Sequence, residues 1–278
     1  MLAPAAAAIV VLRAIPLVDA VKNSLYKALP GGLLAPSWTG LGNYRTLFGD
    51  PDFRATLIRT VLFNVIINPL QILVALLVAV LFVQRVAGRG AWRTLVFIPC
   101  TVPIVGSSIA WGAALQPQGP VNSILHVLGI GAQPFFTSPR QALAGILLVA
   151  SWIGIGYWML FLIAGLRDIN PDMYEAAHID AASAVQTFFR ITIPLLKRPL
   201  LFVLVADTVA NFVLFVPIQL LTNGGPQSST TLLMFDAYQT TYTYGSANQG
   251  AAEIVILSVI MLIIVGVQFS LLREDSDR

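Results

Sequence analysis

Cysteine, histidine and lysine are scarce in this chain of 278 residues. Its single cysteine, Cys100, excludes an internal disulfide framework and a zinc site built from cysteines. Its two histidines leave little from which to assemble a metal centre, so we expect neither a bound metal nor a catalytic group. None of the three lysines, Lys22, Lys27 and Lys197, directly follows a glycine. The chain therefore lacks the glycine-lysine loop with which P-loop ATPases hold phosphate.

Charge is scarce as well. Charged residues make up 10% of the chain and apolar residues 57%, whereas a soluble domain carries about 25% charged residues. With a mean hydropathy of +0.81, the chain is neither a soluble globule nor a disordered segment, which needs low hydrophobicity and high charge. The net charge of +3 is too small to indicate nucleic-acid binding. These values predict an integral membrane protein.

Several long apolar runs are suited to crossing a bilayer. A helix needs about 20 apolar residues to span a hydrocarbon core of about 30 Å, and these runs lack the alternation typical of barrel strands. We therefore predict an all-α integral membrane protein with a single membrane domain over residues 1–278. Its six predicted spans cover residues 2–20, 61–83, 94–115, 142–166, 199–221 and 254–272.

The first of these runs, 2–20, is the least typical because it contains Arg13 and Asp19. A cleaved signal peptide is the alternative, but no basic segment precedes the apolar stretch, which favours a span. Lys and Arg number nine on one side of the predicted membrane and six on the other. The positive-inside rule then places the connections 84–93 and 167–198 and both termini in the cytoplasm.

The connection 167–198 has the pattern of two short helices. Asn170-Pro171-Asp172 provides an N-cap, a proline for the first helical position and an acid for the first turn. Ser183 followed three residues later by Gln186 is a capping box that starts a second helix. A connector alone needs only about 2–8 residues. We therefore favour a surface for a cytoplasmic partner over a mere connector.

The same connection resembles the EAA loop of ABC-importer permease subunits. Glu175-Ala176-Ala177 matches the motif itself, and Ile191-Thr192-Ile193-Pro194 follows at the family spacing. The family glycine position is Ala181 here, and the family leucine position is Ile193. The segments 40–44 (GLGNY) and 221–226 (LTNGGP) resemble the carbohydrate-type permeases of this family, which are described as MalF-like or UgpA-like. The resemblance extends over nearly the whole chain.

This resemblance implies the ABC type I importer permease fold in a prokaryotic inner membrane. It implies three partners: a second, MalG-like permease, a dimeric cytoplasmic ATPase that binds ATP and Mg²⁺, and an extracytoplasmic solute-binding protein. No cofactor is implied for this chain, which would transport a sugar, oligosaccharide, polyol or glycerol phosphate by alternating access. The residues implied to couple to the ATPase are Glu175, Ala176, Ala177, Asp180, Ala181, Ile191 and Pro194.

Polar side chains inside the spans are candidates for the solute path, since polar groups in a membrane usually face a bundle interior or a cavity. The fifth span carries a polar stripe with two neighbouring phenylalanines, and the second span carries a shorter stripe that also includes Gln71. The candidates are Asn211, Phe212, Phe215, Gln219, Asn64 and Asn68. Hydrogen bonds between helices use the same residue types and are the alternative explanation.

Two other functions remain possible at this point. Asp207 in the fifth span is suited to an ion-coupled secondary transporter, although the chain shows no obvious internal repeat of the kind common in such transporters. A membrane enzyme acting on lipid would need clustered acids or histidines near one interface, and the sequence shows none.

Overall fold

The computed structural model describes residues 3–27, 36–83 and 89–272. Residue 2 of the first predicted span, residues 84–88 of the connection 84–93 and residues 273–278 of the tail lie outside the described residues. The chain divides into two compact units. The first unit comprises residues 1–62, 212–215 and 231–263, and the second comprises 63–211, 216–230 and 264–278. Because each unit draws on three separate stretches, they are not successive domains along the chain.

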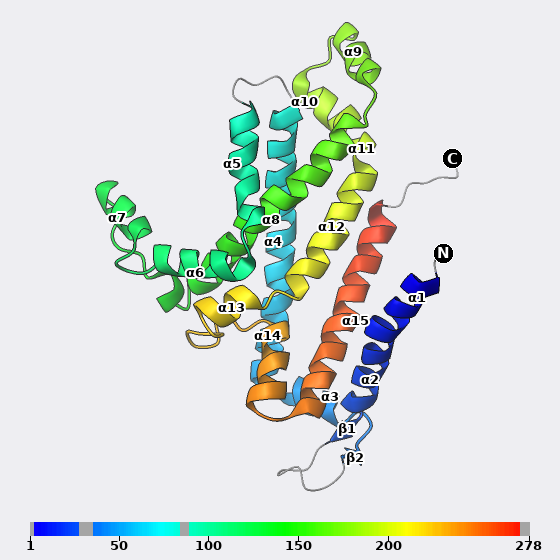
Figure 1. The fold of residues 1–278 in the computed structure, drawn as a ribbon, viewed down its shortest axis with the longest axis vertical. Coiled ribbons are helices and arrows are strands. Elements are labelled where there is room, and N and C mark those ends of the chain that lie inside the picture. Colours follow the sequence, from blue (N-terminus) through cyan, green and yellow to red (C-terminus); the bar gives the residue numbers. More distant parts are fainter. Residues whose placement is uncertain (1–2, 28–35, 84–88, 273–278) are drawn as a thin grey trace. The chain divides into compact units, whose positions relative to one another are not determined.

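The described part of the first unit consists of helices and one short antiparallel pair of strands (Figure 1). Its elements are α1 (Ala3–Ile9), η1 (Val10–Ala14), α2 (Ile15–Ser24), β1 (Tyr26–Lys27), β2 (Ser37–Trp38), α3 (Gly42–Gly49), α14 (Leu233–Tyr238) and η4 (Gln239–Thr243), with the first parts of α4 (Pro51–Val83) and α15 (Ala247–Leu272). The two strands pair antiparallel, with Tyr26 opposite Trp38. The amide of Asn43 donates to the carbonyl oxygens of Ser24 and Tyr26 at 2.7 and 2.8 Å, which fixes α3 beside the two strands.

The second unit contains the remaining helices, with the loop helices at the end where α8 stops and α12 starts (Figure 1). Its elements are α5 (Arg89–Thr101), α6 (Ile104–Ala114), α7 (Pro120–Val127), η2 (Phe135–Thr137), α8 (Ala142–Arg167), α9 (Pro171–Ile179), α10 (Ala184–Thr187), η3 (Phe188–Thr192), α11 (Ile193–Leu195), α12 (Lys197–Phe212) and α13 (Val216–Leu221), with the remainders of α4 and α15.

Four helical stretches among the described residues are long and apolar enough to cross a membrane: Pro51–Val83, Ala142–Arg167, Lys197–Leu221 and Ala247–Leu271. A fifth forms if Gly90–Thr101 and Ile104–Ala114 are taken together, although these two are bent by 103° at their break. Four of the six predicted spans thus have a counterpart among the described helices, and the bent pair corresponds to a fifth if it forms one span. The stretch 2–20 is helical from Ala3 onward in α1, η1 and α2. Each of these helices is shorter than a span, so a first span remains a prediction.

Local sequence explains where the helices begin and break. The helix α4 starts ten residues before the predicted span because Asp50 caps it, accepting from the Asp52 amide at 3.0 Å, and Pro51 takes the first position. Pro103 separates α5 from α6, because proline has no backbone N–H to donate and its ring clashes with the preceding helical turn. The predicted fifth span is interrupted between Phe212 and Val216, where the chain is not helical.

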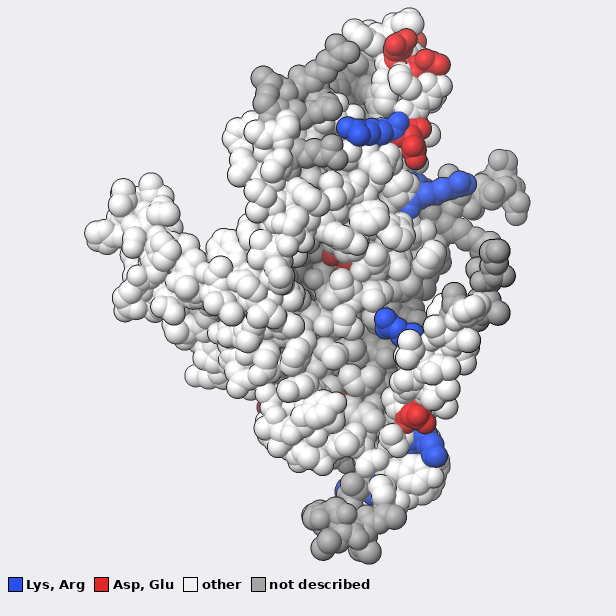
Figure 2. Space-filling view, viewed as in Figure 1, with Lys and Arg blue, Asp and Glu red and all other residues white. Residues whose placement is uncertain are grey.

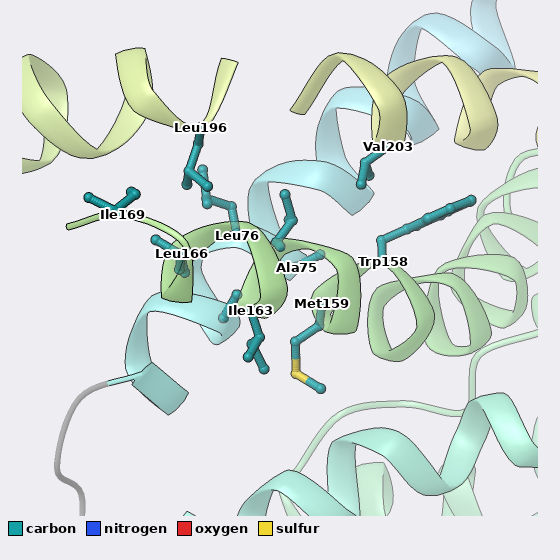
Figure 3. Close-up of a cluster of buried hydrophobic side chains, with 11 residues drawn as sticks. Ala75, Leu76, Trp158, Met159, Ile163, Leu166, Ile169, Leu196 and Val203 are labelled. Carbon is teal, nitrogen blue, oxygen red and sulfur yellow. The ribbon is translucent and has the colours of Figure 1, made fainter. Parts of the chain in front are cut away.

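The apolar core of the second unit lies between α4, α8 and α12 (Figure 3). Ala75 and Ala79 of α4 are completely buried, and their small side chains allow α8 to approach closely. Lipid tails are as apolar as these side chains, so van der Waals packing, rather than the hydrophobic effect, favours the association. The cluster also includes Ile169 and Leu196 of the connection 167–198, which anchor the loop to the helices that bear it.

Close contact between α8 and neighbouring helices depends on two of its glycines. A Cβ atom at Gly156 would collide with the backbone carbonyl oxygen of Val96 on α5. At Gly154, a Cβ atom would come within 3.1 Å of the side chain of Gln71. Both glycines therefore permit close approach between α8 and its neighbours.

Candidate functional site

The first helix of the connection 167–198 begins as its sequence predicts. The side-chain oxygen of Asn170 accepts from the backbone amide of Asp172 at 3.0 Å. Pro171 occupies the first turn of α9, where its missing N–H costs no intrahelical bond. The N-cap thus positions α9 directly after the end of α8, beyond the residues that form the predicted membrane span.

The turn that ends α9 has the hydrogen bonds of a Schellman motif. The Ala182 amide donates to the carbonyl oxygen of Ala177 at 2.9 Å, and the Ala181 amide donates to that of His178 at 3.1 Å. Ala181 has a φ of +53°, in the left-handed region that favours glycine. The chain therefore bends at the position where the family pattern has glycine, with strain at the alanine Cβ.

The second helix of the connection starts with the predicted capping box. The Ser183 hydroxyl accepts from the Gln186 amide at 3.3 Å, and the Gln186 side chain accepts from the Ser183 amide at 2.8 Å. The helical elements α10, η3 and α11 follow in sequence. Ile191 lies in η3 and is half-buried, while Pro194 lies in α11 and is exposed. The helix–bend–helix outline is thereby confirmed.

Contacts between the two halves of the connection hold it together. The hydroxyl groups of Tyr174 on α9 and Thr192 in η3 lie 3.3 Å apart, within hydrogen-bonding distance. Ala177 and Thr192 are both buried. Of the EAA residues, Ala177 therefore faces the protein, whereas Glu175 and Ala176 are exposed.

The outer surface of the connection combines exposed apolar and acidic side chains. Ile179, Val185 and Phe189 are 85%, 67% and 64% exposed. Acidic atoms gather over α9 in the space-filling view, and the exposed acids of this helix and its cap are Asp172, Glu175 and Asp180 (Figure 2). Exposed apolar groups rimmed by polar ones mark a protein interaction surface. We call this surface, formed by α9 and the segment 180–190, the coupling surface.

A second candidate site is a buried polar network inside the helices of the second unit. The side-chain amide of Asn211 on α12 donates to Asn68 and Gln71 of α4 at 2.8 and 3.2 Å. Asp207 accepts from the same amide at 3.0 Å and from the Trp158 indole of α8 at 2.6 Å. These bonds join α4, α8 and α12. They match the alternative of interhelical hydrogen bonding.

The network extends to further helices through hydroxyl groups. The Thr208 hydroxyl accepts from Asn68 at 3.1 Å and from Gln268 of α15 at 2.8 Å. Gln71 donates to the Ser151 hydroxyl of α8 at 3.3 Å. Sequence reasoning missed Trp158, Ser151 and Gln268 as members, because only the packing of distant helices brings them to Asp207 and Thr208.

The predicted solute-path residues do not all gather in this network. Asn68 and Asn211 are bonded to each other within it. Asn64 is buried on α4, and Gln219 lies on α13 beyond the interruption of the predicted fifth span. Phe212 and Phe215 belong to the first unit, where Phe215 packs against Phe235 and Tyr238. The continuous helical face predicted for the fifth span is therefore broken at 213–215.

The first unit also contains one buried acidic residue, Glu253, and one half-buried acidic residue, Asp236. Glu253 accepts from the Thr240 hydroxyl at 2.9 Å. Glu253 lies in the second turn of α15, which begins at Ala247, and its side chain is buried. Burial raises the pKa of Asp236 to about 6, with a further increase from the nearby charge of Asp50. In the part of the chain that is described, no three His, Cys, Asp or Glu residues are placed to hold a metal ion.

Comparison with known proteins identifies the family. Residues 71–274 match the family described as "Binding-protein-dependent transport system inner membrane component". The lactose transport system permease protein LacF of Rhizobium radiobacter is 32% identical, with 98% of this chain and 92% of LacF covered. The sulfoquinovosyl glycerol permease SmoG of Agrobacterium fabrum is 31% identical, with 98% and 89% covered. MalF of Escherichia coli K12 is 34% identical, but only 81% of this chain and 45% of MalF are covered.

The fold agrees with this relationship. The crystal structure of a bacterial ABC transporter that imports the polysaccharide alginate matches with a TM-score of 0.82 at 21% identity, over 100% of this chain and 95% of that one. At this identity the likeness supports the fold alone. The family match, the relatives and the fold together show that the chain belongs to the binding-protein-dependent transport system inner membrane components and is a permease subunit of an ABC importer, not an enzyme.

Proposed function

We propose that this permease moves a carbohydrate or related polar solute into the cell by alternating access, driven by a separate dimeric ATPase. The coupling surface is the observation that carries the proposal. It presents exposed apolar and acidic side chains on two capped helices that are anchored in the core of the second unit. A partner that moves α9 would thereby also move α8 and α12.

The ATPase is the expected occupant of this surface. The chain has no phosphate-binding loop of its own, so ATP and Mg²⁺ would be bound by the partner. Glu175, Ala176 and Asp180 are exposed and would form direct contacts. Ala177, Ala181, Ile191 and Pro194 complete the predicted coupling set; of these, the buried Ala177 and the bend at Ala181 would determine the position of α9.

The solute class follows from the relatives. LacF and SmoG are named for lactose and for sulfoquinovosyl glycerol, and MalF for maltose and maltodextrins. Amide groups suit the hydroxyl groups of any sugar or polyol. The proposed path comprises Asn64, Asn68, Asn211, Gln219, Phe212 and Phe215. In the structure Asn68 and Asn211 bond to each other, so solute hydroxyl groups would have to replace that bond when the path opens.

The remaining partners are a second, MalG-like permease and an extracytoplasmic solute-binding protein. The family description supports the second of these, because it names transport that depends on a binding protein. We place the connection 167–198 and both termini in the cytoplasm, so that the segment 222–246 lies on the opposite side. The alternative of an ion-coupled secondary transporter is not favoured by the family assignment. Asp207 instead accepts hydrogen bonds inside the buried network.

The test is co-purification from mild detergent. The tagged chain is expected to bring the ATPase, measured as ATP hydrolysis, together with the second permease. Glu175→Lys reverses a charge on the coupling surface and is expected to remove most of the ATPase while the second permease remains. Arg140→Glu is the matched control: it reverses a charge at an exposed residue far in sequence from the connection 167–198, and this variant should retain the ATPase. If the unaltered chain purifies without the ATPase in a detergent that keeps membrane complexes intact, the proposal is contradicted.

A further inference from the structure

A row of aromatic rings runs through the first unit. Phe215 stacks on Phe235 with ring centroids 6.1 Å apart and an interplanar angle of 29°. The ring centroid of Tyr238 lies 4.7 Å from that of Phe215, and the ring centroid of Tyr242 lies 4.9 Å from that of Tyr238. Tyr238 and Tyr242 are four residues apart on consecutive helical turns of α14 and η4, so they share one face. Four rings therefore form a continuous series in which each ring contacts the next.

Exposure increases along this row. Phe235 is 3% exposed, Tyr238 38% and Tyr242 74%. Rings needed only for core packing would be buried throughout, as Phe235 is. A series with one end in the protein and the other at the surface instead offers ring faces along a line that leads inward.

The surroundings of the outer rings are polar. Residues 239–249 contain no leucine, isoleucine, valine or methionine. The side chains with hydroxyl or amide groups nearest to the two tyrosines in sequence are Gln239, Thr241 and Thr243. Interfacial aromatic belts of membrane proteins border apolar, lipid-facing surface, and no branched aliphatic side chain is present in this segment. Hydroxyl and amide groups beside an aromatic face are the donors and acceptors that orient a polar ligand in an otherwise apolar site.

A sugar ring has the chemistry to match this arrangement. The face of an aromatic ring is electron-rich and its edge electron-poor, so the C–H groups on one side of a pyranose are attracted to an aromatic face. The hydroxyl groups around the sugar then remain available to hydrogen-bond neighbouring side chains. We infer that Phe215, Tyr238 and Tyr242 form a stacking track that binds the sugar rings of the solute on its way into the permease. This inference rests on the proposed carbohydrate function.

The test uses the complete transporter in proteoliposomes with its ATPase, second permease and solute-binding protein. Uptake of radiolabelled lactose, maltose and maltotetraose is measured, and the sugar transported best by the unaltered protein is used for the variants. Tyr242→Ala is expected to raise KM about five- to tenfold with less than a twofold change in kcat, because stacking lost equally from the bound and transition states affects KM alone. Tyr242→Trp should restore the KM. Tyr244→Ala removes a ring that is 71% exposed, in the same segment but outside the row, and is expected to leave KM within twofold.

Each contrary result has a distinct meaning. Equal KM values for Tyr242→Ala and Tyr244→Ala, with sugar transport intact, would overturn the track and leave the proposed function standing. A reduced amount of solute-binding protein retained by Tyr242→Ala would overturn the track by showing that Tyr242 contacts that protein. No ATP-dependent uptake of any of the three sugars by the unaltered complex would overturn the proposed function and the track together.

Discussion

The strain at Ala181 predicts that replacing this residue with glycine stabilises the coupling loop. A left-handed backbone costs a residue with a Cβ atom about 1–2 kcal/mol. Glycine removes that cost but gives the unfolded chain more freedom, which offsets about 0.4–1 kcal/mol. The difference leaves a gain of about 1 kcal/mol for Ala181→Gly, which is about fivefold in the equilibrium for local opening of the loop.

Amide hydrogen exchange measures this gain directly. The amides of Ala181 and Ala182 donate to the carbonyl oxygens that close the turn, so they exchange only when the turn opens. We expect their protection to increase about fivefold in Ala181→Gly. Ala181→Val should lower it, because a β-branched side chain is a genuine outlier at positive φ.

A matched substitution within α9, the helix that this turn ends, is expected to change amide protection in the opposite direction. Ala176 lies in the interior of α9, where the backbone is helical and the side chain is exposed. Ala176→Gly is expected to cost about 1 kcal/mol and to reduce protection about fivefold. Equal effects of glycine at positions 176 and 181, or weaker protection in Ala181→Gly, would refute the account of strain at the bend.

Three further perturbations follow from the packing and the charges. Gly156→Ala should lower the thermal stability of the purified protein by about 1–3 kcal/mol, because the added methyl group collides with the Val96 carbonyl; an unchanged melting temperature would contradict that contact. Asp207→Ala should cost about 1–3 kcal/mol, because it leaves the buried Trp158 indole without its acceptor, whereas the Asn211 amide keeps Asn68 and Gln71 as acceptors; a gain in stability, measured by denaturant unfolding, would contradict this. For Asp236, burial raises the pKa to about 6, so the folded state binds this proton more tightly than the unfolded state does. Its contribution to stability is complete below pH about 4 and is lost as the pH rises through about 6; Asp236→Asn should remove this pH dependence, and an identical pH profile for the variant would contradict it.

Local signals predicted the coupling loop well. Asn170 and Ser183 cap helices through side chains within three residues of their targets, so no tertiary information is needed to place α9 and α10. The helix α8 was predicted within one residue because an uninterrupted apolar run determines it. The break between α5 and α6 also has a local cause, because Pro103 interrupts the hydrogen bonds of a continuous helix.

Features that depend on distant packing were not predictable in the same way. Trp158, which donates to Asp207, and Gln268, which donates to Thr208, lie 49 and 60 residues from their partners in sequence. The interruption of the fifth span at residues 213–215, by contrast, has a local signal that sequence reasoning missed. Pro217 has no backbone N–H to donate to the carbonyl oxygen of Val213, and its ring clashes with that carbonyl in a continuous helix.

ATP-driven uptake by the reconstituted transporter tests the central claim most directly. Proteoliposomes containing this permease, its second permease and its ATPase are given labelled sugar with the solute-binding protein outside and ATP at the ATPase. Accumulation against the gradient that requires ATP hydrolysis and survives an uncoupler is the predicted result. Accumulation that persists without ATP and collapses with the uncoupler would contradict the account.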